Sequence, residues 1–121
     1  MSSSLNEVRL LGNLGADPDT IKGGIAFRMA TSQRWTDDDG RTRERTDWHR
    51  VCTFGRRAEA LAKMLRKGSR VLVCGALRVS AWETDSGEKR TSVDVIASDV
   101  ILCDPAPESA RRGHNDRPAE G

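Results

Sequence analysis

A single stretch of this sequence has the spacing of an amphipathic helix, and it lies among segments with the spacing of β-strands. From Arg56 to Lys67, apolar side chains recur three and four positions apart, and Gly68 follows as a helix terminator. The apolar positions of this predicted helix are Ala58, Leu61, Ala62 and Leu65. The other regular segments are rich in β-branched and aliphatic residues, which predicts strands. They are Leu5–Leu14, Ile25–Trp35 and Thr46–Gly55 before the helix, and Ser69–Val79 and Thr91–Leu102 after it.

Three strands, a helix and two further strands form the element order of the OB-fold. We therefore predict an all-β domain over residues 1–102, a five-stranded Greek-key barrel with one α-helix between strands 3 and 4. Two polar segments around a Gly, Thr36–Glu44 and Asp85–Glu88, are predicted to be hairpin loops. Gly75 lies in the middle of a strand, which predicts a kink of the kind that a strongly curved barrel needs.

The alternation of side chains along a strand predicts which residues face the core. In the second strand, Phe27 shares an apolar face with Ile25 and Met29, so we assign this ring to the core. In the last strand, alternation places one set of side chains opposite Asp94, Ile96, Ser98 and Val100. That set is Val93, Val95, Ala97 and Asp99.

The segment Thr46–Gly55 holds two of the five aromatic residues of the chain. Because strand side chains alternate, Trp48, Arg50 and Phe54 lie on one face together with Cys52, and the other face holds His49, Val51 and Thr53. A core would not readily accept an Arg between two rings, whereas a surface that stacks bases and holds phosphates needs both residue types. This face therefore indicates nucleic-acid binding, and the alternative is that both rings belong to the core.

Composition and charge narrow the class of protein. The 121 residues suffice for one domain with its own core, and the net charge of +2 is only mildly basic. Cys52, Cys74 and Cys103 lie far apart, without a CxxC motif or a signal-peptide-like start, which predicts reduced thiols in a cytoplasm. No apolar run is long enough to cross a bilayer, so we predict no membrane association. We also predict no cofactor, no metal and no enzyme activity, because no set of residues has metal-ligand or nucleophile–base spacing.

Six short segments resemble, in the right order, the bacterial single-stranded DNA-binding protein family. The resemblance covers roughly residues 5 to 102, in the segments Gly12–Pro18, Ala30–Trp35, Asp47–Val51, Phe54–Glu59, Leu65–Ser69 and Gly75–Arg78. It implies sequence-independent binding and protection of single-stranded DNA in replication, recombination and repair. It also implies a cytoplasmic, nucleoid-associated protein.

The resemblance implies roles for particular residues. Four aromatic residues of the family stack on bases, and the matching positions here are Trp35, Trp48, Phe54 and Trp82. Positive side chains would then follow the phosphates, although each could equally be a solvated surface charge; the candidates are Arg34, Arg50, Arg56, Arg66, Lys67 and Arg78. Family members are usually homotetramers, in which the residue matching His49 lies at a subunit contact. A homodimer is the second possibility.

The end of the chain differs from typical members of the family. Residues 103–121 contain no large apolar side chain, so we predict a disordered C-terminal tail. Typical members end in an acidic tip with an apolar pair that recruits replication and repair proteins, whereas this sequence ends in Arg-Pro-Ala-Glu-Gly. We therefore expect a short-tailed member, such as a paralogue or a phage or plasmid version, and recruitment of partner proteins by that route stays open.

Two other functions stay open. One is a primosome-type accessory scaffold that acts mainly through protein contacts, although such proteins tend to lack the full set of stacking rings. The other is an enzyme or a sugar-binding OB domain, which would need a polar catalytic or ligand cluster that the sequence does not contain.

Overall fold

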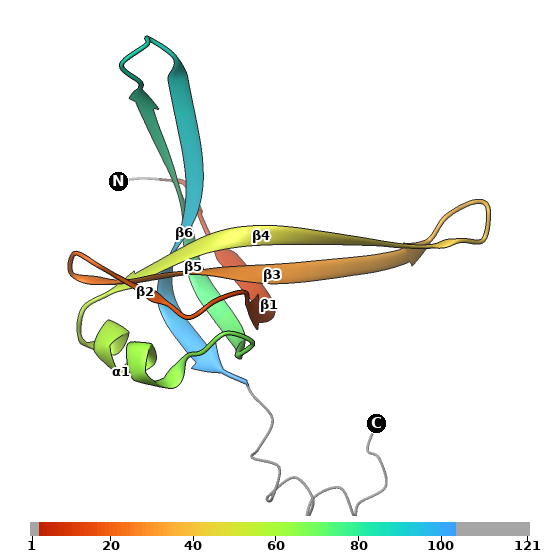
Figure 1. Ribbon diagram of the computed structural model, residues 1–121, viewed down its shortest axis with the longest axis horizontal. Helices are drawn as coiled ribbons and strands as arrows, with labels where there is room; N and C mark the ends of the chain where they lie inside the picture. The colour runs from red at the N-terminus through yellow and green to blue at the C-terminus, as the bar shows by residue number, and fades with distance from the viewer. Residues whose placement is uncertain (1–2, 104–121) are drawn as a thin grey trace, which may run out of the picture.

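A closed β-barrel forms the body of the molecule in the computed structural model, which describes residues 3–103 (Figure 1). In this part of the chain the strands are β1 (Val8–Leu14), β2 (Asp19–Ile21), β3 (Gly24–Thr36), β4 (Thr42–Phe54), β5 (Arg70–Glu83) and β6 (Lys89–Leu102). One helix, α1 (Arg56–Met64), connects β4 to β5. The predicted disordered tail lies outside the described residues, apart from Cys103.

Five strands close the barrel. They pair in the order β1–β5–β6–β4–β3, and β3 returns to β1 through the pair Asn13 and Ala30. Strands β4 and β6 run parallel, and the other neighbours run antiparallel. This topology confirms the predicted OB-fold, a five-stranded barrel with a helix in the connection before its fourth strand.

The short strand β2 was not predicted. Its residues Asp19–Ile21 pair with the first residues of β3 in a tight hairpin, in which Gly23 has a positive φ of 79°. Gly tolerates this left-handed conformation because it lacks a Cβ atom. Three residues are too few to give a visible alternation in the sequence, so the segment resembled a loop.

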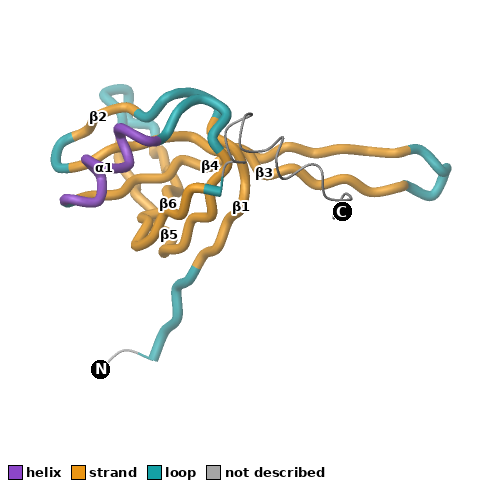
Figure 2. Tube along the Cα trace, turned by 90° about the horizontal axis from the view of Figure 1, so that it is seen from below, coloured by secondary structure: helices purple, strands orange, loops and turns teal. Residues whose placement is uncertain are grey.

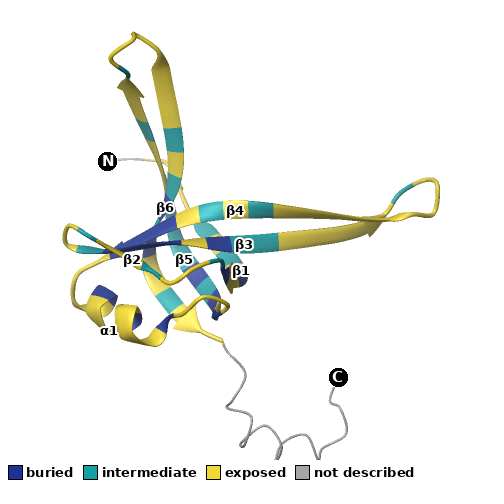
Figure 3. Ribbon diagram, in the orientation of Figure 1, coloured by how far each residue is buried: buried dark blue, intermediate teal, exposed yellow. Residues whose placement is uncertain are grey.

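The core consists of side chains that alternation turns inward from the barrel strands. Phe27 is only 3% exposed, which confirms its assignment to the core, and Met29, Val51, Val71 and Val73 are fully buried. Ala58 and Leu61 of α1 are buried in the same cluster. Figure 3 shows buried positions where the barrel strands come together and on α1, and mainly exposed positions along the two projecting hairpins.

The helix is shorter than predicted. It ends at Met64, and Leu65 already has extended backbone angles (φ −84°, ψ 141°). Leu65 is still fully buried, so its place in the apolar pattern reflects core packing and not a further helical turn. Ala62, predicted on the apolar side, is exposed, and Gly68 lies in the turn that follows (φ 91°), not directly after the helix.

A bulge changes the alternation in β6. Cys74 pairs with Asp99, but the next residue, Gly75, pairs with Ala97, so that Ser98 has no partner in the ladder. A Cβ atom at Gly75 would overlap the Ile96 carbonyl, which explains why this position needs a Gly. The extra residue shifts the phase of the strand, so the prediction for Asp99 was wrong: Asp99 is exposed, and Val100 packs against the core.

Two long hairpins project from the barrel in different directions (Figure 1), and Figure 2 shows the one formed by β3 and β4 from another side. The β3–β4 ladder continues to Thr36 and Thr42, and the β5–β6 ladder continues to Glu83 and Lys89. The first loop is therefore much shorter than the predicted Thr36–Glu44. We call these projections the β3–β4 arm and the β5–β6 arm.

The β3–β4 arm is held by polar contacts. Three ion pairs join its side chains: Arg34–Glu44 at 3.7 Å, Arg43–Asp37 at 2.8 Å and Arg45–Asp47 at 3.0 Å. The Asp37 carboxylate also accepts the backbone N–H groups of Asp39 and Arg41, each at 2.9 Å, and so closes the loop. The Arg43 guanidinium, followed by the Arg41 amide, lowers the pKa of Asp37 below its ordinary value.

Candidate nucleic-acid interface

Strand β4 carries the aromatic and basic side chains that the sequence singled out. Val51 and Thr53 point into the barrel and are buried, whereas Trp48 and Phe54 lie on its outer side and are 51% and 44% exposed. The predicted division of this strand into two faces is therefore confirmed. Cys52 shares the outer face but is buried, and the Arg50 Nη1 atom lies 3.1 Å from its Sγ atom.

Four charged residues form a row across the outer side of the barrel, and we call it the charged row. Cross-strand pairing places Arg28 of β3 beside Arg50 of β4, Arg50 beside Asp94 of β6, and Asp94 beside Arg78 of β5. Directly paired side chains lie on the same face of a sheet. The row therefore combines three guanidiniums with one carboxylate next to Trp48.

Arg28 was missing from the predicted cations, although its strand contained the signal. It lies between Phe27 and Met29, which both face the core, so alternation turns Arg28 outward. The charges of the row also act on the buried Cys52 thiol. Burial is the largest effect and raises the pKa of this thiol, and Arg50 opposes that rise.

Trp82 extends the same outer side onto the β5–β6 arm. It is 51% exposed and lies four residues beyond Arg78, directly opposite Arg90. Side chains lie on the same face of a strand when their residue numbers differ by an even number, so Trp82 and Arg78 leave β5 on the same side. Trp48, Phe54 and Trp82 thus share the outer side with the charged row.

Trp35 has a different placement. It is 46% exposed on the β3–β4 arm, where it pairs with Arg43, whereas Trp48 pairs with Ala30. Because Trp35 is an odd number of residues from Ala30, the two Trp side chains leave opposite sides of the ladder. Along the ladder, Trp35 and Trp48 therefore do not share a face, and the twist of a two-stranded arm is what can bring Trp35 toward the other rings. A stacking role for Trp35 stays a prediction.

The remaining predicted cations are exposed but do not form one group. Arg34 lies on the same side of the β3–β4 ladder as Trp48, and Arg56 begins α1 shortly after Phe54. Arg66 and Lys67 lie in the turn after the helix, where the Lys67 backbone N–H donates to Asp17 Oδ1 at 2.7 Å. Only Arg50 and Arg78 of the predicted set belong to the charged row.

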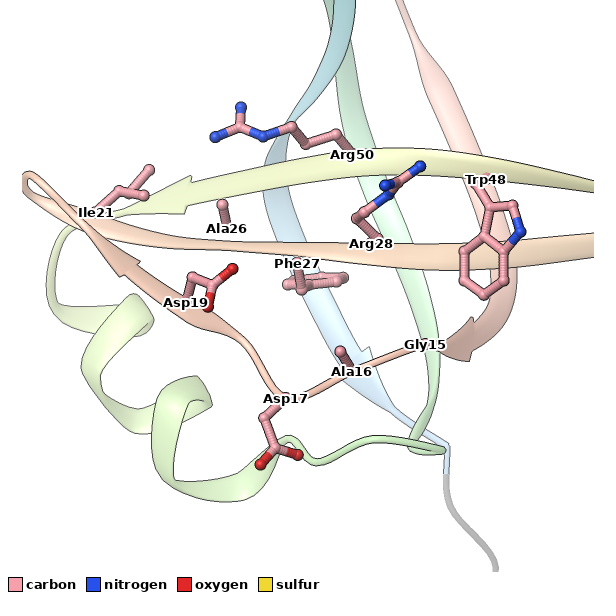
Figure 4. Close-up of a pocket in the computed structure, with 10 residues that line it drawn as sticks. All are labelled: Gly15, Ala16, Asp17, Asp19, Ile21, Ala26, Phe27, Arg28, Trp48 and Arg50. Carbon is pink, nitrogen blue, oxygen red and sulfur yellow. The ribbon is translucent and has the colours of Figure 1, made fainter.

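A cavity of about 420 Å³ opens beside Trp48 (Figure 4). Its lining residues come from the segment that joins β1 to β2 and from β2, β3 and β4: Gly15, Ala16, Asp17, Asp19, Ile21, Ala26, Phe27, Arg28, Trp48 and Arg50. Figure 4 shows the Trp48 ring hanging over this segment at Gly15. A Cβ atom at Gly15 would overlap Cζ3 and Cη2 of Trp48, so only Gly leaves room for the observed ring position.

His49 points away from the charged row. It pairs with the buried Met29, on the face of β4 opposite Trp48, as the alternation predicts. Its Nε2 atom lies 2.8 Å from the Thr31 hydroxyl, and the residue is half-buried. A subunit contact for His49 stays a prediction.

The described residues 3–103 show no cluster of His, Cys, Asp or Glu that could hold a metal ion. In the same range, no helix has the length and apolar character needed to span a membrane. Cys52, Cys74 and Cys103 are free thiols.

An OB-fold barrel with exposed aromatic rings and guanidiniums on its outer side is typical of nucleic-acid-binding proteins. Residues 5–103 match the profile of the Single-strand binding protein family. A relative from Xylella fastidiosa (strain 9a5c), "Single-stranded DNA-binding protein 1", is 41% identical over 106 residues, which are 83% of this chain and 78% of the relative. A "Single-stranded DNA-binding protein" from Xanthomonas axonopodis pv. citri (strain 306) is 40% identical over 84% of this chain and 59% of its own length.

Solved structures of single-stranded DNA-binding proteins have the same fold as this chain. The structure described as "Plasmodium falciparum SSB complex with ssDNA" has a TM-score of 0.75 at 32% identity, over 86% of this chain and 99% of that one. The wild-type single-stranded DNA-binding protein from Thermus aquaticus has a TM-score of 0.69 at 36% identity, over 84% and 52%. The chain belongs to the Single-strand binding protein family.

Proposed function

We propose that this chain binds single-stranded DNA without reading its sequence and protects it. The observation that carries the proposal is the outer side of the barrel, where Trp48, Phe54 and Trp82 are about half exposed around the charged row. Soluble proteins rarely leave large apolar rings together on the surface unless the rings bind a partner. Family membership and the names of the similar proteins support the same ligand.

The residue types suggest the division of work in this binding. Every base has a π-face, so stacking on Trp or Phe contributes about 1–3 kcal/mol per base whatever the base is. Trp35, Trp48, Phe54 and Trp82 would provide this stacking. The guanidiniums and the ammonium would neutralise phosphates; besides Arg28, they are Arg34, Arg50, Arg56, Arg66, Lys67 and Arg78.

The titration of Trp fluorescence tests this function. We expect an oligo(dT) to quench the emission of the full chain strongly, because all three Trp residues are exposed, and a duplex of equal length to bind far more weakly. In a salt series, the logarithm of the binding constant should fall with the logarithm of salt concentration, with a slope of roughly −0.7 per phosphate neutralised. Equal affinity for both DNA forms would contradict the proposal.

The proposal also covers the oligomeric state of the protein and its location in the cell. The subunits would form a homotetramer, or failing that a dimer, with His49 at a subunit contact. Leu11, Leu72 and Ile101 support self-association: they pair in one line across β1, β5 and β6, and Leu11 and Ile101 are about half exposed. Such a protein would act in the cytoplasm at the nucleoid, where replication, recombination and repair expose single strands.

Mass measurement in solution tests the assembly. At micromolar concentration of the full chain, we expect the mass of four subunits, or of two in the second case. If the His49 side chain makes a hydrogen bond at a subunit contact, His49→Ala should weaken the assembly and lower its measured mass. A monomer of the unaltered protein would remove the proposed assembly and would leave the DNA-binding proposal in place.

A further inference from the structure

Asp94 places a negative charge in the middle of the cationic surface, between Arg50 and Arg78. We propose that Asp94 is an affinity-setting residue of the DNA site, because its carboxylate competes with a DNA phosphate for Arg50. The inference rests on the proposed function, since it assigns a role within the same site. It predicts a binding surface with lower affinity and weaker salt dependence than its cations alone would produce.

The contact geometry supports a real pairing. Arg50 Nη1 lies 3.2 Å from Asp94 Oδ2, which is at the upper end of the range for an N–H···O hydrogen bond and within the distance of an ion pair. The Asp94 side chain is 15% exposed, the lowest value among the carboxylates of the six ion pairs within residues 3–103. A carboxylate that is shielded from water interacts more strongly with neighbouring charges than an exposed one does.

Asp94 lies on the outer face of the sheet, within the proposed DNA site, and does not contribute to the packing of the core. The parallel pairing of β4 with β6 brings Arg50 and Asp94 together on the outer side of the barrel. The neighbouring residue of β6, Val95, points inward and supplies the core contact at this level. Removing the charge of Asp94 therefore leaves the apolar packing intact.

A bound phosphate would meet both charges at once. It would gain from Arg28, Arg50 and Arg78, and it would be repelled by the carboxylate that lies among them. Salt dependence arises because each phosphate that a protein cation neutralises releases bound cations from the DNA. While Arg50 stays paired with Asp94, one phosphate fewer is neutralised and fewer cations are released. Asp94 thus lowers both the affinity for single-stranded DNA and the steepness of its salt dependence.

The test compares the full chain with Asp94→Asn, which keeps the shape and removes the charge. In oligo(dT) titrations over a salt series, we expect D94N to bind about three- to tenfold more tightly at low salt. We also expect its log–log slope to be steeper by about 0.7, the value for one further phosphate. Unchanged or weaker binding by folded D94N would overturn the proposal.

Asp99→Asn is the matched control. Asp99 lies on the same strand, carries the same charge and pairs with Arg57 at 2.7 Å, but it lies beyond the bulge and outside the charged row. D99N should leave the affinity within about twofold and the slope unchanged. An equal gain in D99N and D94N would show a general charge effect and would overturn a specific role for Asp94.

A second measurement keeps the test decisive. Arg50→Ala should cost more affinity in the D94N background than in the unaltered protein, because Arg50 is then free for phosphate. An equal or smaller loss of affinity in D94N would contradict the competition between Asp94 and phosphate for Arg50.

If D94N fails to fold in a thermal melt, Asp94→Ser removes the same charge and is expected to give the same result. If the unaltered protein does not bind oligo(dT), the proposed function fails, whereas tight binding without a gain in D94N rejects only the role of Asp94.

Discussion

Replacement of Trp48 by Ala is expected to weaken binding of oligo(dT) by roughly 10- to 100-fold, in line with the loss of one stacked base. The ring is half exposed, borders the cavity and lies beside the charged row, so its removal takes stacking area from the site without opening the core. The thermal stability of W48A should change little. Titration by fluorescence anisotropy of a labelled oligo(dT) measures the affinity without relying on the lost Trp.

Phe27→Ala provides the contrast for this experiment. Phe27 is buried in the barrel, so the smaller side chain should cost about 3–5 kcal/mol in the free energy of unfolding through the cavity that it leaves. Once the fraction of folded protein is taken into account, F27A should lose less affinity than W48A. The reverse order would mean that the division between core and binding surface is wrong.

Gly15→Ala is expected to weaken binding by about tenfold, although residue 15 itself offers no side chain to DNA. The new methyl group would overlap the Trp48 ring and force the indole out of its place over Gly15. Gly15 has no positive φ, so Ala fits the backbone there and the loss should come from the displaced ring. The Trp emission spectrum of G15A should shift, because the environment of the indole changes.

A double variant separates this effect from general damage. If Gly15 acts only by positioning Trp48, then G15A adds little further loss of affinity to W48A, since two residues that act through one ring are not additive. Full additivity of the two losses would show that Gly15 contributes in another way.

The local patterns predicted the faces of the elements well. Alternation around Val51 and Phe27 separates core from surface because each strand of a barrel has one side toward a single closed core. The order of the elements predicted the barrel topology, and the family resemblance implied the same fold. Together they were sufficient for the five-stranded OB-fold and for the exposed state of all four predicted stacking rings.

The errors in the strands have a common physical origin, which is that strand pairing depends on the partner strand. Ser98 has no unusual local sequence, yet the mismatch of β6 with β5 at Gly75 leaves it unpaired and reverses the side of Asp99. Similarly, the polar residues of the β3–β4 arm resembled a loop, because an exposed two-stranded ladder needs no apolar alternation. The side of Trp35 is different, because β3 alone contains the signal: Trp35 is eight residues from the core-facing Phe27, so alternation places both side chains on the same side of the strand.

Because the β3–β4 arm is polar, salt acts on its ion pairs as well as on the contacts with phosphate. Its contacts beyond the backbone ladder include exposed ion pairs, such as Arg34–Glu44, and pairs of this kind contribute little and weaken further as salt screens them. Added salt would therefore change the stability of the arm only slightly, while it weakens the phosphate contacts at the barrel. Stacking on the rings does not depend on ion release, so at high salt a bound strand would be held mainly by the rings.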